Sequence, residues 1–302
     1  MPIRRAGALV ALALSLAACG LGEREGFARE IEGASRRAAE SGTAVGTLGI
    51  GFELDVSSLP PDAREQALEA NAQATGDPVV TYDVVVDLDR RRAAYLVDGT
   101  PKVVFDDLEV YGTRHDAIPE EARPWVLVDL RDIDDEESPV DPQREGPVAG
   151  IEAVNPAVLL DLAAGPLTGS IERIGREDGL TGYRANFDLD KALTDVGRRR
   201  YDDEHLEPTQ LVLDLLGTAG TMHPGEVWLD DEGRARRFRI EIKRANEFGF
   251  SFIMVLHLEL ERWGERFDVP TPADDALLQV DGFKQFLRAV VPPLERRGPA
   301  AP

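Results

Sequence analysis

An alternation of large apolar and polar residues late in the chain constrains its fold more than any other feature. From residue 248 to residue 260 every second side chain is large and apolar, and the same period of two runs through Phe238, Ile240 and Ile242. Successive side chains of a β-strand point to opposite faces, so this period predicts strands with one apolar face. The turn signal Asp231-Glu232-Gly233 makes the earlier stretch the second strand of a hairpin.

Strand patterns and turn signals also recur through the earlier part of the chain. They predict strands at residues 47–56, 80–88, 93–97, 102–111, 124–130, 170–175, 182–189 and 226–230. Strands that follow one another so closely pair antiparallel, because their connections are too short for a crossover. We therefore expect one long antiparallel sheet in a single domain.

Helices are expected between these strands, and the fold class is α+β. Phe27, Ile31, Ala34 and Ala38 fall at helical spacing, and Asn155 is a helix cap. The predicted helices are residues 27–38, 60–74, 156–164, 208–218 and 283–290, with a short one from residue 190. Amphipathic helices of this kind cover the apolar face of the sheet. The acidic, proline-rich residues 131–150 are predicted to form a surface loop.

The N-terminal segment resembles the signal peptide of a bacterial lipoprotein. Two arginines precede an uncharged run, residues 8–18, and the run ends in Leu16-Ala17-Ala18-Cys19-Gly20, which is similar to a lipobox. The resemblance implies cleavage before Cys19, acylation of Cys19 and a location on the outer face of the cell membrane. The competing interpretation, a cysteine inside a membrane-spanning helix, needs about 20 apolar residues, and this run is shorter.

The charge balance and the cysteine content exclude some classes of partner and of stabilisation. The chain carries 56 acidic and 34 basic residues, a net charge of −22, which argues against nucleic acid and against electrostatic adhesion to an anionic membrane. Because Cys19 is the only cysteine, the mature domain has no internal disulfide, and its stability comes from burial. We expect a monomer.

Four stretches together resemble a known family. They are PWVLVDL (residues 124–130), GSIERIGREDGLTGYRANFDLDKAL (169–193), EVWLDDEGRARRFRIEI (226–242) and LELERWGERFDVPTP (258–272). Their order and spacing are similar to those of the actinobacterial lipid-carrying lipoproteins LprG and LppX, whose fold is like that of LolA and LolB. The resemblance implies a curved, half-barrel sheet that wraps the helices and an apolar cavity for the acyl chains of a lipid or glycolipid, with a membrane transporter as a further partner.

On this resemblance the chain divides into four parts. Residues 1–18 are a signal peptide, 19–42 a tether and first helix, 43–276 a LolA-like domain, and 277–302 a C-terminal extension. The residues expected to line the cavity come from three strands and share an apolar face; they are Leu48, Ile50, Phe52, Phe238, Ile240, Phe250, Phe252, Met254 and Leu256. The alternative is that helices fill this face, which would make the protein a closed-core accessory lipoprotein that binds a protein partner and no small ligand.

The common signatures of catalysis and of metal binding are absent from the sequence. The sequence has no nucleophile elbow, no phosphate-binding glycine loop, no zinc-protease motif and no cysteine pair. Arg114-His115-Asp116 could orient a general base and residues 134–137 could bind calcium, but a surface turn and a solvated charge run explain them better. We expect a protein that is not an enzyme and has no cofactor and no metal.

Overall fold

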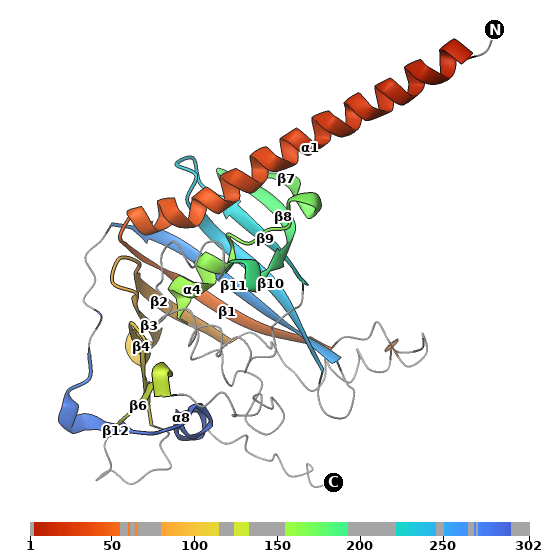
Figure 1. Ribbon diagram of the computed structural model, residues 1–302. Coiled ribbons are helices and arrows are strands. Elements are labelled where there is room, and N and C mark those ends of the chain that lie inside the picture. The colour runs from red at the N-terminus through yellow and green to blue at the C-terminus, as the bar shows by residue number, and fades with distance from the viewer. Residues whose placement is uncertain are drawn as a thin grey trace.

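The computed structural model describes residues 3–54, 60, 64–65, 80–114, 124–132, 155–192, 222–245, 251–264, 269 and 271–290. Within them the fold is mixed α+β and consists mainly of one curved sheet of twelve strands that does not close into a barrel (Figure 1). The strand order is β12-β6-β5-β4-β3-β2-β1-β11-β10-β9-β8-β7. All neighbours are antiparallel except β12 and β6, which are parallel.

The elements have the following bounds. The strands are β1 (Thr43–Leu54), β2 (Val80–Asp87), β3 (Arg92–Val97), β4 (Thr100–Asp106), β5 (Glu109–Thr113), β6 (Trp125–Asp129), β7 (Glu172–Glu177), β8 (Leu180–Asp188), β9 (Met222–Leu229), β10 (Ala235–Ala245), β11 (Ser251–Trp263) and β12 (Leu277–Gln279). The helices are α1 (Ile3–Glu40), α4 (Pro156–Leu162), α5 (Leu189–Lys191) and α8 (Phe283–Val290), with 3₁₀ turns η1 (Leu130–Asp132), η3 (Thr168–Ser170) and η5 (Asp274–Ala276).

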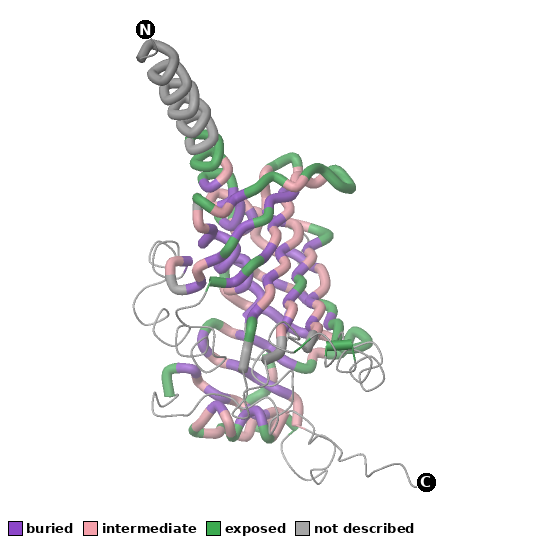
Figure 2. Tube along the Cα trace, turned by 90° about the vertical axis from the view of Figure 1, so that its right-hand side faces the viewer, coloured by how far each residue is buried: buried purple, intermediate pink, exposed green. Residues whose placement is uncertain are grey.

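Three helices cover one face of the sheet, which we call the inner face. The helix α1 contacts β9, β10 and η3, α4 contacts β2, β3 and β10, and α8 contacts β5 and β6. Their apolar residues join those of the strands in one continuous core. Figure 2 shows the result: buried residues alternate along the strands, while exposed residues gather at the turns and on α1 where it leaves the sheet. The predicted antiparallel sheet with helices on its apolar face is confirmed.

A second, smaller cluster lies on the opposite, outer face of the sheet. It consists of Ala94, Val104, Tyr111 and Val269. Val269 comes from the chain after β11, and the Arg92 side chain donates a hydrogen bond to its carbonyl oxygen at 3.0 Å. The half of the sheet around β3 to β6 is therefore covered on both faces.

Local signals in the sequence explain several element boundaries. The side chain of Asn155 accepts a hydrogen bond from the Ala157 amide at 2.9 Å, and Pro156 begins α4, as predicted. The helix α1 ends at Glu40, and Gly42, with a φ of 78°, turns the chain into β1. The helix predicted at residues 283–290 is α8 with the same bounds.

One strand prediction was wrong. Residues 102–111 were expected to form a single strand, but the chain turns between β4 and β5. Asp107 makes the turn in a left-handed conformation with a φ of 59°, which aspartate adopts more readily than most residues. The turn lacks the glycine and proline that mark turns in sequence. Residues 277–279, expected only as part of an extension, form β12 and lengthen the sheet.

Some predicted elements lie outside the described residues. They are most of the helix at 60–74, most of the loop at 131–150, the helix at 208–218 and the start of the strand at 248–260.

Candidate functional site on the inner face of the sheet

The strand register brings the predicted lining residues that the structure describes onto one face. Ile50 on β1 pairs with Leu256 on β11, and Leu256 pairs with Ile240 on β10. The row continues through Gly225 on β9 to Ala185 on β8. Because paired residues of neighbouring strands point to the same side, this is a transverse apolar row across five strands.

Two parallel rows flank it. One joins Leu48, Leu258 and Phe238, and the other joins Phe52, Met254 and Ile242. Phe252 has the same strand parity as Met254. The side chains of Phe52 and Phe252, and all of Phe250, lie outside what the structure describes.

The described lining residues are packed on all sides in this conformation. Leu48, Ile50 and Ile240 expose 0% of their surface, and Met254, Leu256 and Phe238 expose 3% or less. Ile31 and Ala34 of α1 and Leu159 and Leu160 of α4 belong to the same core. Phe238 also packs edge-on against Phe187 of β8, with ring centroids 5.3 Å apart. A side chain with no exposed surface contacts protein atoms in every direction, so these residues form core here.

The helix α1 is held on the inner face by aromatic and polar contacts. Phe27 packs on the ring of Tyr183 of β8, with centroids 5.3 Å apart, and the Tyr183 hydroxyl donates to a Glu30 carboxylate oxygen at 2.8 Å. Burial raises the pKa of Tyr183 to about 12, and the hydrogen bond to Glu30 and its negative charge act in the same direction. The side chain of Arg24 donates to the Gly169 carbonyl oxygen in η3 at 3.0 Å.

A buried hydrogen bond joins α1 to α4. Ser35 exposes 2% of its surface and Asp161 exposes 0%, and the Ser35 hydroxyl donates to Asp161 Oδ1 at 2.6 Å. Sequence reasoning missed this pair, since nothing in the sequence links two residues that are 126 positions apart. The helical stripe from Phe27 to Ala38 revealed the helix but not its polar contacts.

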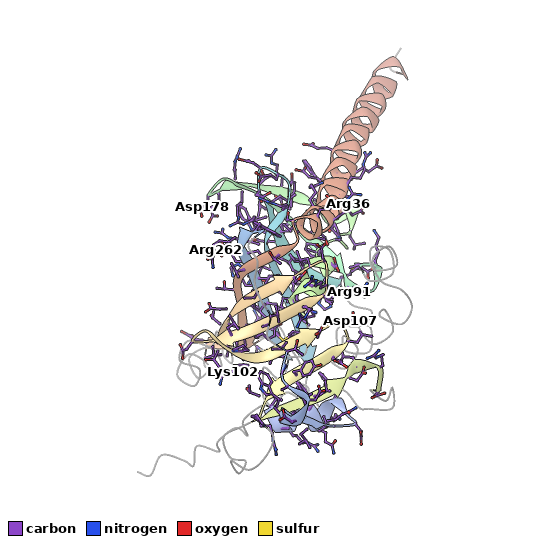
Figure 3. The ribbon with its side chains drawn as sticks, turned by 90° about the vertical axis from the view of Figure 1, so that its left-hand side faces the viewer. Arg36, Arg91, Lys102, Asp107, Asp178 and Arg262 are labelled. Carbon is purple, nitrogen blue, oxygen red and sulfur yellow. The ribbon has the colours of Figure 1, made fainter. Side chains whose placement is uncertain are left out.

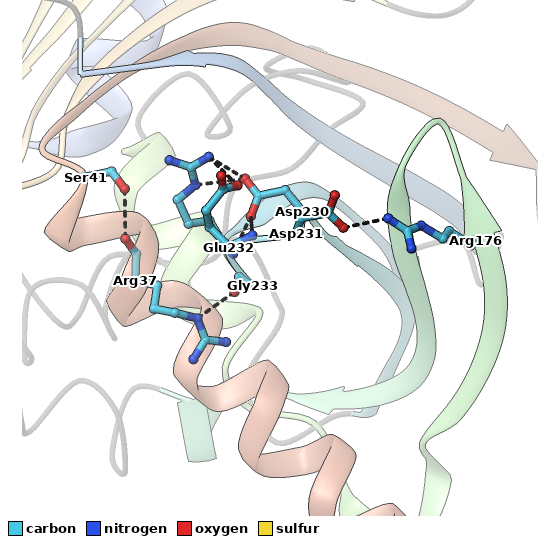
Figure 4. A network of polar contacts seen from close by, with 8 residues as sticks. Arg37, Ser41, Arg176, Asp230, Asp231, Glu232 and Gly233 are labelled. Atoms are coloured by element: carbon cyan, nitrogen blue, oxygen red, sulfur yellow. Dashed lines mark hydrogen bonds and ion pairs between the residues drawn. The ribbon is translucent and has the colours of Figure 1, made fainter.

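The end of α1 is fixed to the turn between β9 and β10 (Figure 4). Arg37 Nε donates to the Gly233 carbonyl oxygen at 2.9 Å, and in the same turn Asp231 forms an ion pair with Arg176 of β7 at 2.6 Å. The turn therefore connects the helix to the edge of the sheet. Ser41 closes the helix locally with a 3.0 Å hydrogen bond to the Arg37 carbonyl oxygen.

Charged side chains occupy the turns and the outer face of β8 to β11. Arg237 of β10 bonds Glu259 of β11 at 2.7 Å and lies within 3.5 Å of Asp178 in the turn between β7 and β8. Figure 3 shows such residues spread around the sheet, among them Lys102 and Arg262. The outer face of β8 to β11 is thus polar, in contrast to the inner face.

Large apolar side chains that are exposed gather at one end of the sheet. In the described part of the chain they are Val80 (38% exposed), Val97 (36%) and Met222 (49%). Val80 begins β2, Val97 ends β3 and Met222 begins β9. The register puts all three at the end where β1 finishes and β11 begins.

The histidines that the structure describes lie on strands of the sheet, and the described acidic residues form no cluster of metal ligands. His223 is buried on β9, His257 is exposed on the outer face of β11, and Asp188 caps α5 by accepting from the Lys191 amide at 2.9 Å. Among the described residues no group of three or more potential metal ligands converges. His115 and residues 134–137 lie outside them. Of the helices described, none has an apolar run long enough to span a bilayer.

No protein-family model matches the chain, and no curated protein is significantly similar to it.

Proposed function

We propose that the chain is a LolA-like lipoprotein, similar to the LprG and LppX carriers, that is anchored through acylated Cys19 on the outer face of the cell membrane. There it binds a lipid or glycolipid against the inner face of the sheet and exchanges it with a membrane transporter. The single observation that carries the proposal is the apolar inner face of a curved, unclosed sheet, continuous from Tyr183 on β8 to Tyr95 on β3.

Such a face suits acyl chains for a simple energetic reason. Hydrocarbon gains about 25 cal/mol for each Å² removed from water, and a concave sheet contacts a chain along its length. An empty carrier must keep the same face out of water, since large exposed apolar patches promote aggregation. Coverage by α1 and α4 is therefore expected of an empty carrier. We expect acyl chains to enter at the end marked by Val80 and Val97, where apolar side chains of the inner face already reach the surface.

The anchor is tested with Cys19→Ser. Wild-type chain should sediment with membranes and carry the mass of a diacylglycerol and an N-linked acyl chain at Cys19, because two or more chains are needed for stable anchoring. The variant should lack these masses and leave the membrane fraction. A wild-type protein with an unmodified Cys19 thiol would contradict the proposal.

Lipid binding is tested by native mass spectrometry of the acylated protein purified from membranes. We expect a non-covalently bound lipid in the wild type. Two matched variants each enlarge a buried alanine: Ala185→Ile on the inner face and Ala94→Ile on the outer face. In both variants overpacking should lower the free energy of unfolding by about 1–3 kcal/mol. Only Ala185→Ile should lose several-fold in lipid occupancy.

The alternative function, a closed-core accessory lipoprotein that binds a protein partner, is favoured by the complete burial of Leu48, Ile50 and Ile240. It predicts a wild-type protein free of lipid whose melting temperature does not change with added phospholipid. A bound ligand would raise that temperature by mass action. If the wild type carries no lipid and added phospholipid does not raise its melting temperature, the closed-core function replaces the carrier proposal.

A further inference from the structure

The position of α1 limits how far the domain can move from its anchor. The helix is attached to the sheet from Arg24 onward, through the Gly169 carbonyl oxygen, the Tyr183 ring and hydroxyl, and the Gly233 carbonyl oxygen. Ala28, Ile31, Ala34 and Ala38 are buried along the same helix. Residues 24–40 therefore belong to the folded domain and are not a flexible tether.

Only four residues, 20–23, separate Cys19 from this docked segment. An extended chain spans at most about 3.6 Å per residue, and a helix rises about 1.5 Å per residue. The α-carbon of Cys19 thus lies within roughly 18 Å of that of Arg24 in any conformation, and closer if the helix persists.

The direction in which α1 leaves the sheet decides which surface is near the anchor. Figure 1 shows α1 crossing β9, β8 and β7 and running on past the β7 edge, while β6, β12 and α8 lie at the other end of the molecule. Neighbouring strands are about 4.8 Å apart, so a twelve-stranded sheet measures roughly 50 Å from edge to edge along its curve. The β12 edge is out of reach of the short tether.

We infer that η3 and β7 face the anchoring bilayer at close range and that α8 and β12 are turned away from it. This inference rests on the proposed acylation of Cys19. The helix acts as a docked spacer that fixes both the distance and the orientation of the domain relative to the lipid headgroups.

The side chains on η3 and β7 suit a surface that lies beside the lipid headgroups and does not insert into the bilayer. Glu172, Arg173, Arg176 and Glu177 of β7 are exposed, and Arg176 is paired with Asp231 at 2.6 Å. In the described part of the chain, the exposed large apolar residues lie on β2, β3 and β9 and none lies on β7 or η3. Charged groups of both signs stay hydrated beside a polar interface.

Single cysteines report the orientation, because the thiol of Cys19 is blocked by the acyl group and the chain has no other cysteine. Gly169→Cys on η3 and Gln285→Cys on α8 are both exposed, and a Cβ at position 169 meets no atom within 4 Å. The acylated protein is labelled with a fluorescent donor and reconstituted in phosphatidylcholine vesicles that carry a headgroup-linked acceptor. Energy transfer should be several-fold stronger from position 169 than from position 285. Equal transfer from the two positions would overturn the inference.

A second set of variants separates docking from anchoring. The double variant Arg24→Ala with Phe27→Ala removes contacts of α1 with η3 and β8. A twenty-residue glycine-serine insertion after Gly22 lengthens the tether instead. Each change should reduce the difference in energy transfer between positions 169 and 285. Glu25→Ala, an exposed change on the same helix, should leave it unchanged. Protein that fails to sediment with the vesicles would refute the acyl anchor, whereas vesicle-bound protein without an orientation difference would refute this inference alone.

Discussion

The hydrogen bond between Ser35 and Asp161 is a fully buried polar contact between α1 and α4. Ser35→Ala removes a donor from a carboxylate that has no access to water. We expect a loss of about 1–3 kcal/mol in the free energy of unfolding, measured by urea denaturation. Ser41→Ala is the control, since the Ser41 hydroxyl bonds the Arg37 carbonyl oxygen of its own helix and Ser41 is half-buried; it should lower the free energy of unfolding by less than about 1 kcal/mol. Equal losses of unfolding free energy in the two variants would show that burial of the Ser35–Asp161 hydrogen bond does not matter for stability.

Tyr183 makes the docking of α1 sensitive to alkaline pH. Its pKa rises from the ordinary value of 10.0 to about 12 in the fold, so the native state holds the hydroxyl proton more tightly than the unfolded chain. The stability that this provides is complete below pH 10 and is lost as the pH rises towards 12. The stability difference between wild type and Tyr183→Phe should therefore be smaller at about pH 11 than at about pH 8. A stability difference that stays constant between these two pH values would contradict the raised pKa of Tyr183.

At the scale of elements, the contact between α8 and β5 depends on the absence of a side chain. A Cβ on Gly112 would lie 2.4 Å from Val290 Cγ2 and 3.0 Å from the Phe286 ring. Gly112→Ala should displace α8 and lower the free energy of unfolding by about 1–3 kcal/mol, as overpacking does. Adding Val290→Ala makes room for the new methyl group. The double variant should be more stable than the sum of the two single changes predicts, and additive losses would disprove the clash.

Sequence patterns predicted elements whose signals are local. Alternation located β1, β2, β10 and β11, helical spacing located residues 27–38 of α1, and the cap at Asn155 located α4. The turn at Asp107 was missed because a left-handed aspartate leaves no glycine in the sequence. The strand β12 was missed because it is three residues long and its parallel pairing with β6 joins segments about 150 positions apart.

The candidate site was predictable only in part. Strand parity correctly put Leu48, Ile50, Ile240 and Leu256 on one face, since parity follows from the period of two. What covers that face was not predictable, because the packing of Ile31 or Leu159 against it depends on tertiary contacts that no local pattern encodes.

At the scale of the whole molecule, the middle of the sheet should be its most protected part. The strands β1 and β11 are paired on both sides and carry Leu48, Ile50 and Leu258, which expose at most 1% of their surface. The edge strand β7 is paired on one side only, and most of its residues are exposed. Amide hydrogen exchange should be slowest in β1 and β11 and fastest among the strands in β7. Comparable rates in the centre and at this edge would indicate that the sheet does not open from β7.

The pairing of β1 with β11 has a kinetic consequence. Each of the other antiparallel pairs joins two strands that are consecutive in the strand order of the described chain, so that β1 to β6 and β7 to β11 are two meanders. Leu48 and Leu258, roughly 210 residues apart, meet only at the seam between them, and closing so long a loop costs entropy before any contact forms. Gly46 lies at this seam, where an added Cβ would come within 1.8 Å of the Glu259 carbonyl oxygen. The two meanders should therefore fold early and independently, and the rate at which their seam closes sets the folding time of the molecule.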